Sequence, residues 1–480
     1  MPSLRALAFH CALAPASLFL AQTSFMRILL SLMLLLSAAV TAQTSDSLTI
    51  RSIYTTALTQ GDCYQWLHHL CKNIGPRLSG SQGAADAVEY TRYIMDTLAL
   101  DSVWLQPVMV PHWVRGEPEK GRIISEKPGL SQQLTLCALG GSIATGDGIT
   151  AGVVEVRSFE DLNAMKDKDV KGKIVFFNVP MNQAHIRTFP AYGETARYRV
   201  RGADHASKKG AVGMVLRSLS TTLDDYPHTG VMIYTDTVPR IPGAALSTLA
   251  AERLSEALQR DPRLKLHIRM TCETLPDVLS YNVIGEIRGS ENADEIIVVG
   301  GHLDAWDNGE GAHDDGAGCV QAIQTLQTFR RMGYQPKRTV RAVMYMNEEN
   351  GTRGGKEYAR VADSLGEQHI FGIESDAGGF TPHGFGINDS ALVSKLKANW
   401  GDLLYQFGLH ELSVGGGGVD INPMREHGCI TAGLHPDSQR YFDYHHAPSD
   451  TFDKVNHREL KLGAAAMATL AYLISEYGVQ

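Results

Sequence analysis

Cysteine is scarce in this sequence and never occurs as a CxxC pair. There are seven cysteines in 480 residues. The six that follow residue 42 are widely separated: Cys63, Cys71, Cys137, Cys272, Cys319 and Cys429. This spacing excludes a structural zinc site built from paired cysteine thiolates. Disulfides are compatible with export from the cell, but the spacing does not say which cysteines would pair.

Long runs of one charge and long apolar runs are also missing after residue 42. The whole chain has a formal net charge of −8, from 44 basic and 52 acidic residues that are mixed along the sequence. Such a mixed and mildly acidic composition disfavours nucleic-acid binding. No later stretch approaches the roughly 20 apolar residues that a membrane-spanning helix needs. We therefore expect neither a nucleic-acid partner nor, once the leader is removed, a membrane partner.

The first 42 residues contain no lysine and no acidic residue. Within them, Met26-Arg27 supplies a basic start, residues 28–36 an apolar stretch, and residues 39–42 (Ala-Val-Thr-Ala) a small-residue cleavage site. These are the three parts of a secretory signal peptide. We predict a leader at 1–42, cleavage after Ala42 and a secreted or periplasmic protein. The true start is either Met1 or Met26.

Residues 276–480 alternate between strand-like and helix-like patterns. An apolar run at 296–299 is followed by a helical pattern at 319–331 and a second strand-like run at 340–346. This alternation predicts an α/β fold with a mixed, largely parallel sheet sandwiched by helices. From Leu460 to Ile474 apolar residues recur three and four positions apart. That period predicts a final helix with one apolar face packed on the sheet.

Residues 141–275 have a different texture, with short strand-like runs such as 173–177 and 212–216 between small turns. This pattern is typical of a mainly-β module. We predict that it separates an N-terminal part of the main domain, at 43–140, from the α/β part at 276–480.

Five polar clusters follow the apolar runs of the α/β part or lie close to its end. They are His302-Leu303-Asp304, His313-Asp314-Asp315, Asn347-Glu348-Glu349-Asn350, Glu374-Ser375-Asp376, and His445-His446 with Asp450. Residues at the carboxyl ends of parallel strands line the crevice of an open α/β sheet. Each cluster alone has an ordinary alternative: a surface histidine for the first, a helix cap for the second and a polar loop for the other three. Together they hold the histidines and carboxylates of a metal centre. These donors suit zinc and are also compatible with manganese or cobalt.

Two of the clusters contain adjacent acids whose roles can differ. Asp314 and Asp315 have no basic neighbour, so they repel each other unless a cation compensates. The alternative is that one of them caps the following helix, and one residue could do both. Spacing alone does not say which of the two would bind a metal. Glu348 and Glu349 follow a strand, where side chains alternate, so one can bind a metal while the other faces substrate.

Taken together, the motifs resemble the co-catalytic zinc aminopeptidase family, and within it the carboxypeptidase Q-like dipeptidases. The matching segments are Gly301 to Asp307, Asp314 to Gly318, Glu348-Glu349, Glu374 to Gly378, His445-His446 before Asp450-Thr451, and Gly75-Pro76-Arg77. The resemblance covers nearly all of the chain after the leader and is strongest from Tyr281 onward. It implies a zinc-exopeptidase fold and two zinc ions per protomer.

The resemblance also assigns metal ligands. It implies that Asp314 bridges the two zinc ions, with His302 and Asp376 completing one shell and Glu349 and His446 the other. Two zinc ions about 3.5 to 4 Å apart can activate a shared water and polarise a carbonyl.

Two catalytic residues follow from the same resemblance. Glu348 would be the general base for the attacking water. The carboxylate of Asp304 would orient the imidazole of His302. A cis peptide bond between Asp314 and Asp315 is a further implication.

The middle segment resembles a protease-associated domain. The resemblance rests on Val170 to Ile174, Lys209 to Gly213 and Ile241 to Gly243. It implies that residues 141–275 are an insert in the peptidase domain.

The implied function is a zinc-dependent exopeptidase that hydrolyses peptide bonds near a free N-terminus, as an aminopeptidase or a dipeptidase. Its partners would be peptide or dipeptide substrates, with a homodimer left open. Two other classes share the fold. Glutaminyl cyclases close a ring instead of cleaving a peptide, and the protease-associated insert argues against them. Receptor-like relatives lose metal ligands, and the complete ligand set argues against that class.

Overall fold

The computed structural model describes residues 45–480 of the chain. The predicted leader and its cleavage after Ala42 lie outside the described residues. A helix over 45–60 opens the described part, and Ile53–Gln480 form one compact unit. Among the helices of the described part, none is both long and apolar enough to cross a membrane.

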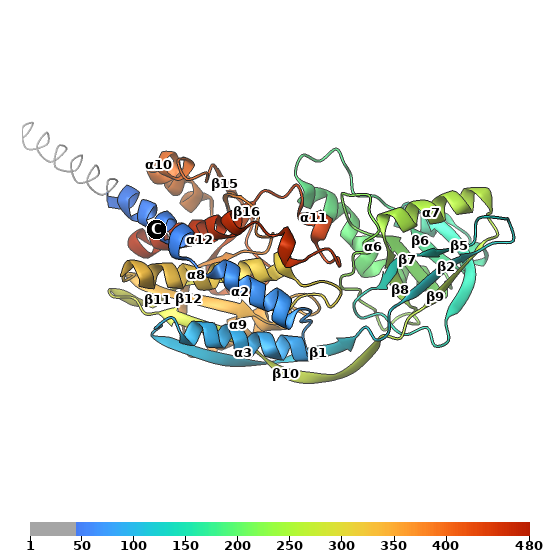
Figure 1. The fold of residues 1–480 in the computed structure, drawn as a ribbon, viewed down its shortest axis with the longest axis horizontal. Coiled ribbons are helices and arrows are strands. Elements are labelled where there is room, and N and C mark those ends of the chain that lie inside the picture. The colour runs from blue at the N-terminus through green and yellow to red at the C-terminus, as the bar shows by residue number, and fades with distance from the viewer. Residues whose placement is uncertain (1–44) are drawn as a thin grey trace, which may run out of the picture. The chain divides into compact units, whose positions relative to one another are not determined.

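The α/β part of the chain is built on an eight-stranded sheet with the order β1-β10-β12-β11-β13-β16-β14-β15 (Figure 1). Its strands are β1 (Ser102–Val114), β10 (Glu273–Ile287), β11 (Asn292–His302), β12 (Arg338–Tyr345), β13 (Gln368–Glu374), β14 (Pro382–Ile387), β15 (Glu411–Val414) and β16 (Ile430–Pro436). The four central strands β12, β11, β13 and β16 are parallel, whereas β1–β10, β10–β12 and β14–β16 pair antiparallel. The predicted mixed and largely parallel sheet is confirmed.

Helices cover this sheet because its central strands are apolar on both faces. Val298 of β11 packs with Tyr345 and with Tyr358 of α9 (Arg353–Leu365). The next residue, Val299, is also fully buried and points to the opposite face. The helices α8 (Ala317–Met332) and α12 (His457–Tyr477) contact each other and both contact β11 and β12. The predicted final helix is therefore present, with its apolar face buried.

The remaining helical segments of the α/β part are shorter or lie nearer its edges. They are α2 (Cys63–His69), η1 (Leu70–Ile74), α3 (Gln82–Asp96), η2 (Ala312–Gly316), α10 (Ser390–Tyr405), η3 (Asn422–His427), α11 (Tyr441–Tyr444) and η4 (Phe452–Lys454). All six cysteines of the described part are buried and unpaired.

A second eight-stranded sheet lies between β1 and β10 in the chain, with the order β3-β2-β9-β5-β6-β7-β8-β4. Its strands are β2 (Lys120–Ile124), β3 (Gln132–Leu134), β4 (Leu136–Ala138), β5 (Ile149–Val156), β6 (Ile174–Phe177), β7 (Gly213–Arg217), β8 (Gly243–Leu246) and β9 (Lys265–Arg269). Its helices are α4 (Phe159–Ala164), α5 (Asp167–Val170), α6 (Thr188–Lys208) and α7 (Thr248–Arg260). The strands β2 to β4 precede residue 141, the boundary expected from sequence.

The long strands β1 and β10 pair with each other and connect the two sheets (Figure 1). The second sheet and its helices, residues 120–269 and called the second unit below, also pack directly on the α/β part. Phe177 and Tyr198 of the second unit share an apolar cluster with Tyr441 and Phe442 of α11. This contact places α6 next to the segment that carries His446.

Candidate metal centre and active-site cleft

The predicted ligands lie where parallel strands end. His302 is the last residue of β11, Glu349 lies in the turn after β12, and Asp376 follows β13. Because β12, β11 and β13 are neighbours in that order, their carboxyl ends meet at one edge of the sheet. Asp314 comes from η2, before α8, and His446 follows α11. The structure brings all five predicted ligands together.

The carboxylate of Asp314 lies between two histidines. Its Oδ1 is 3.2 Å from Nε2 of His302, and its Oδ2 is 3.3 Å from Nε2 of His446. The same His302 nitrogen is 3.5 Å from Oδ1 of Asp376, and the same His446 nitrogen is 3.0 Å from Oε2 of Glu349. All of these side chains except the half-buried Asp376 are buried. The geometry thus has two halves that share one carboxylate.

Asp315, the neighbouring acid, is engaged with the backbone instead. Its Oδ2 accepts a hydrogen bond from the amide of His302 at 3.0 Å, and its Oδ1 accepts one from the amide of Gly318 at 3.0 Å. The peptide bond between Asp314 and Asp315 is cis, as the resemblance implied. The two acids that spacing could not separate therefore have different surroundings, and Asp314 faces both histidines.

Buried polar side chains hold the loop that carries Asp314. The carboxylate of Asp450 accepts hydrogen bonds from the amides of His313 at 2.8 Å and Asp314 at 3.1 Å. The guanidinium of Arg77 is fully buried and donates to backbone carbonyls. Its acceptors are Leu303 at 2.7 Å, Glu310 at 2.7 Å and Gly311 at 2.8 Å. Arg77 thus ties the strand end at His302 to the loop before Asp314.

Asp304 orients His302 with a different atom from the one expected. Nδ1 of His302 donates to the backbone carbonyl of Asp304 at 2.9 Å, whereas the carboxylate Oδ1 is 3.8 Å away. That carboxylate oxygen instead accepts from the amides of Asn347 at 2.7 Å and Glu348 at 3.0 Å. Asp304 therefore fixes both the imidazole and the turn that carries Glu348 and Glu349. The sequence pattern could not distinguish the backbone oxygen from the carboxylate.

The electrostatics of the centre fit bound cations. Burial, and after it the charge of Asp314, raises the pKa of Glu349 well above its usual range. Burial would lower the pKa of His302, but hydrogen bonds with Asp314 and Asp376 raise it overall. Oδ2 of Asp314 and Oε1 of Glu349 are buried without a hydrogen-bond partner. Buried carboxylate oxygens without donors are costly unless a cation binds them, and three carboxylates with two imidazoles suit zinc.

His445 is a further histidine at the centre. Its ring stacks on that of His446 with centroids 3.6 Å apart, and its Nε2 is 3.8 Å from Oδ2 of Asp314. Burial lowers the pKa of His445 to about 3, so the imidazole is neutral. Both His445 and His446 lie close enough to Asp314 to share a metal ion with it, but of these two histidines only His446 is also close to Glu349.

A cleft of about 530 Å³ opens over this centre. It is lined by Glu348 and by four of the five predicted ligands, all except His302. Helix α6 of the second unit contributes Phe189, Tyr192 and Arg199 to the opposite wall. Sequence reasoning missed these three residues. They carry no local motif, and only the packing of the second unit against α11 brings them to the cleft.

Comparisons with known proteins identify the family of this chain. Residues 282–471 match peptidase family M28. Carboxypeptidase Q of Mus musculus is 33% identical over 418 residues, which cover 87% of this chain and 86% of that protein. Carboxypeptidase Q of Xenopus laevis is 34% identical over the same shares of both chains. The chain belongs to peptidase family M28. It is a metallopeptidase, as the sequence predicted.

Solved structures of M28 peptidases and related enzymes share the fold of this member. A peptidase M28 precursor from Shewanella amazonensis is 34% identical, with a TM-score of 0.85 over 90% of this chain and 97% of that one. A zinc aminopeptidase from Bacillus subtilis shows the same fold at 19% identity, with a TM-score of 0.61 over 86% of this chain and 93% of that one. The predicted α/β exopeptidase fold is confirmed.

Proposed function

We propose that this M28 peptidase is an exported, zinc-dependent exopeptidase that cleaves dipeptides with free amino and carboxyl ends. The observation that carries the proposal is the position of Arg199. This buried cation lines the same cleft as Glu348 and Asp314, and its Nη1 lies 3.4 Å from Nδ1 of His446.

The metal part of the proposal uses the five side chains around Asp314. His302, Asp314 and Asp376 would hold one zinc ion, and Asp314, Glu349 and His446 would hold the other. The two unpartnered carboxylate oxygens at this centre support the assignment. The similar structure from B. subtilis is that of a zinc aminopeptidase, which supports the choice of zinc as the metal. Bound zinc would supply Lewis acidity to a water nucleophile and to the substrate carbonyl.

Glu348 is proposed to accept a proton from the attacking water and to return it to the departing amine. Its half-buried side chain lines the cleft, and its amide is held by the carboxylate of Asp304. Burial, and after it the charge of Asp376, raises the pKa of Glu348 to about 8. A carboxylate that lines the cleft and stays outside the proposed metal shells is free to take up a proton and to release it.

Arg199 is the group that would recognise a carboxylate. Its Nη2 donates to the hydroxyl of Tyr192 at 2.8 Å, and its Nε is buried without a partner. Within the described residues, no aspartate or glutamate forms an ion pair with it. A buried cation without an anionic partner is destabilising, because desolvation is not offset by a counter-charge. A substrate carboxylate in the cleft would provide that counter-charge.

The position of Arg199 limits the length of the substrate. Its Nη1 lies 3.4 Å from Nδ1 of His446, a distance shorter than the roughly 3.8 Å between successive Cα atoms, so the guanidinium is next to one of the proposed ligands. In a dipeptide the carboxylate follows the scissile bond after a single Cα atom. In a longer peptide a neutral amide occupies that position. Glu374 lines the adjoining cleft, next to the proposed ligand Asp376, and would give the free amine an acidic environment.

Other parts of the proposal rest on sequence. Export is supported by the leader pattern of residues 1–42. The identity of the second unit as a protease-associated domain is supported by its three matching motifs and by its position between β1 and β10. The homodimer stays a prediction. Membership of a peptidase family argues against the cyclase and receptor-like alternatives.

Hydrolysis of four related peptides, with and without chelator, tests the proposed function. The set is one dipeptide, its N-acetyl form, its C-terminal amide and the tripeptide extended at the carboxyl end. We expect the free dipeptide to be cleaved best and chelator to abolish turnover. Equal cleavage of the N-acetyl form would contradict exopeptidase action at a free N-terminus. Equal cleavage of the tripeptide and the amide would contradict the dipeptide preference alone.

A further inference from the structure

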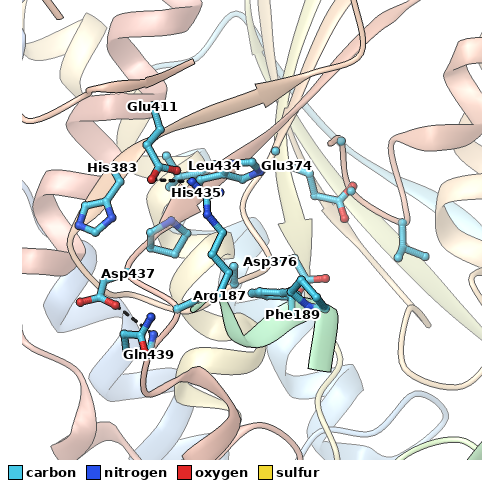
Figure 2. A pocket seen from close by; sticks show the side chains of 18 of the residues that line it. Arg187, Phe189, Glu374, Asp376, His383, Glu411, Leu434, His435, Asp437 and Gln439 are labelled. Carbon is cyan, nitrogen blue, oxygen red and sulfur yellow. Dashed lines mark hydrogen bonds and ion pairs between the residues drawn. The ribbon is translucent and has the colours of Figure 1, made fainter. Parts of the chain in front are cut away.

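A second cleft, of about 660 Å³, adjoins the one over the metal centre (Figure 2). Asp376, Phe189 and Val419 line both clefts and therefore mark where they meet. The far wall is formed by the strands β14 and β15 at the edge of the sheet, and by residues that precede α6. Three side chains on this wall have no role in the proposed reaction.

These side chains are His383, His410 and Glu411. One ligand atom from each lies within 4.8 Å of the other two. The parallel strands β14 and β15 explain the grouping, because Gly384 pairs with Glu411 and the two histidines precede these positions by one residue. The imidazole centroids are 5.0 Å apart and the rings are tilted by 41°, so the histidines are not stacked on each other.

His410 is oriented as a metal-binding imidazole usually is. Its Nδ1 lies 3.0 Å from the backbone carbonyl of Gly408. A carbonyl oxygen only accepts, so Nδ1 carries the proton and Nε2 keeps its lone pair free for a metal. Metal-bound histidines commonly donate their second nitrogen to a carbonyl in this way, which fixes tautomer and ring orientation.

The charges around the cluster favour a cation. The residues that line this cleft include the four carboxylates of Glu374, Asp376, Glu411 and Asp437, against a single arginine, Arg187. Figure 2 shows Arg187 reaching the wall that carries Glu411, and the two form an ion pair of 2.8 Å through Oε1 of Glu411. A carboxylate has two oxygens, so Oε2 can bind a metal while Oε1 keeps its arginine.

We propose that His383, His410 and Glu411 form a third site for a divalent transition metal such as Zn²⁺, separate from the catalytic centre. Two imidazoles and one carboxylate are a recurrent zinc donor set, with water completing the tetrahedron. Zinc bonds of about 2.0 to 2.1 Å require ligand atoms closer together than 4.8 Å. The exposed side chain of His410 can close this gap by rotating about its own bonds. The bound ion would lie in the wall of the second cleft, outside the cleft over the catalytic centre.

Zinc binding to the purified full-length mature enzyme tests this site. Zn²⁺ would be titrated calorimetrically into enzyme whose catalytic zinc is retained, and bound metal would be counted by elemental analysis after dialysis. The wild-type chain is expected to bind one more Zn²⁺ than His410→Gln or His383→Gln. All three proteins should cleave the dipeptide at similar rates. The same zinc stoichiometry in all three would overturn the third site.

Two controls separate this inference from the proposed function. His427→Gln removes an exposed histidine that lies 3.2 Å from a carboxylate, Asp363, in a pair rather than a three-ligand cluster. The His427→Gln variant should keep the additional zinc. If this variant also loses that zinc, the additional zinc binds non-specifically to surface histidines, and the third site is overturned. Asp314→Ala should lose catalytic zinc and still bind the additional ion at His410.

Discussion

Arg199→Gln tests whether the cleft of this peptidase recognises the carboxyl end of its substrate. The substitution removes the cation and keeps a side chain of similar polarity beside Tyr192 and His446. If Arg199 binds the carboxylate, cleavage of the free dipeptide should suffer, whereas cleavage of its C-terminal amide should change little. The ratio of the two rates therefore isolates the carboxylate contact from any general damage to the active site.

The size of the effect follows from the burial of Arg199, which is 5% exposed. A hydrogen bond between charged partners contributes about 1.5 to 3 kcal/mol. Since about 1.4 kcal/mol corresponds to a factor of ten, kcat/KM for the free dipeptide should fall about 10- to 100-fold. The loss should appear mainly in KM if the carboxylate is bound equally in the ground state and the transition state.

The assay measures kcat/KM for a dipeptide and its amide with the wild type, Arg199→Gln and Arg201→Gln. Arg201 is the matched control, since it lies on the same helix α6 two residues later and is exposed. We expect the control to behave as wild type on both substrates. Equal losses on the dipeptide and the amide in Arg199→Gln would refute carboxylate recognition, and zinc analysis would then show whether the variant had disturbed His446.

Three further predictions concern the metal centre and stability. Glu348→Gln should lower kcat by about 100- to 10,000-fold, the usual contribution of a general base, while elemental analysis finds unchanged zinc; near-normal turnover would contradict the role. Asp314→Ala should empty both metal positions together, whereas Asp376→Ala should first weaken one, and equal zinc contents would contradict a shared ligand. Burial lowers the pKa of His369 to about 4. As pH falls from about 6.5 to 4 the unfolded chain therefore binds a proton that the folded chain excludes, so the unfolding free energy should decrease, by on the order of 3 kcal/mol. Denaturant titrations should show a shallower pH slope for His369→Gln, and an unchanged slope would exclude this histidine.

The fold could be predicted well where the sequence has strong periodicity. The strand β12, the helices α8 and α12, and the short strands β6 and β7 lie where apolar runs or three-and-four spacing placed them. The long pair β1 and β10 was not foreseen. The end of β1 at Val114 and the start of β10 at Glu273 are separated by 158 residues of sequence. No pattern within either strand predicts that the two pair with each other.

The candidate site could likewise be predicted only in part from the sequence. The residues His302, Glu349 and Asp376 could be grouped in advance, because each follows an apolar strand and parallel strands end at one edge. The part played by the backbone of Asp304 could not be read from residue types, because hydrogen-bond partners at this range depend on the turn geometry. Arg199 was also missed, since the cleft residues beside it are remote in sequence. His410 was missed because its grouping with His383 depends on the pairing of β14 with β15.

The sequence by itself determined that this chain has a metal-binding α/β peptidase domain, because ligand types and strand ends are local properties that recur in a fixed order. Tertiary structure alone decided which acid faces both histidines. Asp315 is held by the amides of His302 and Gly318, whereas Asp314 is left between His302 and His446. Tertiary structure also decided what surrounds the centre. The packing of α6 against α11 brings Arg199 to the cleft, where it contacts His446, which lies 247 residues later in the chain. No short-range pattern encodes such a contact.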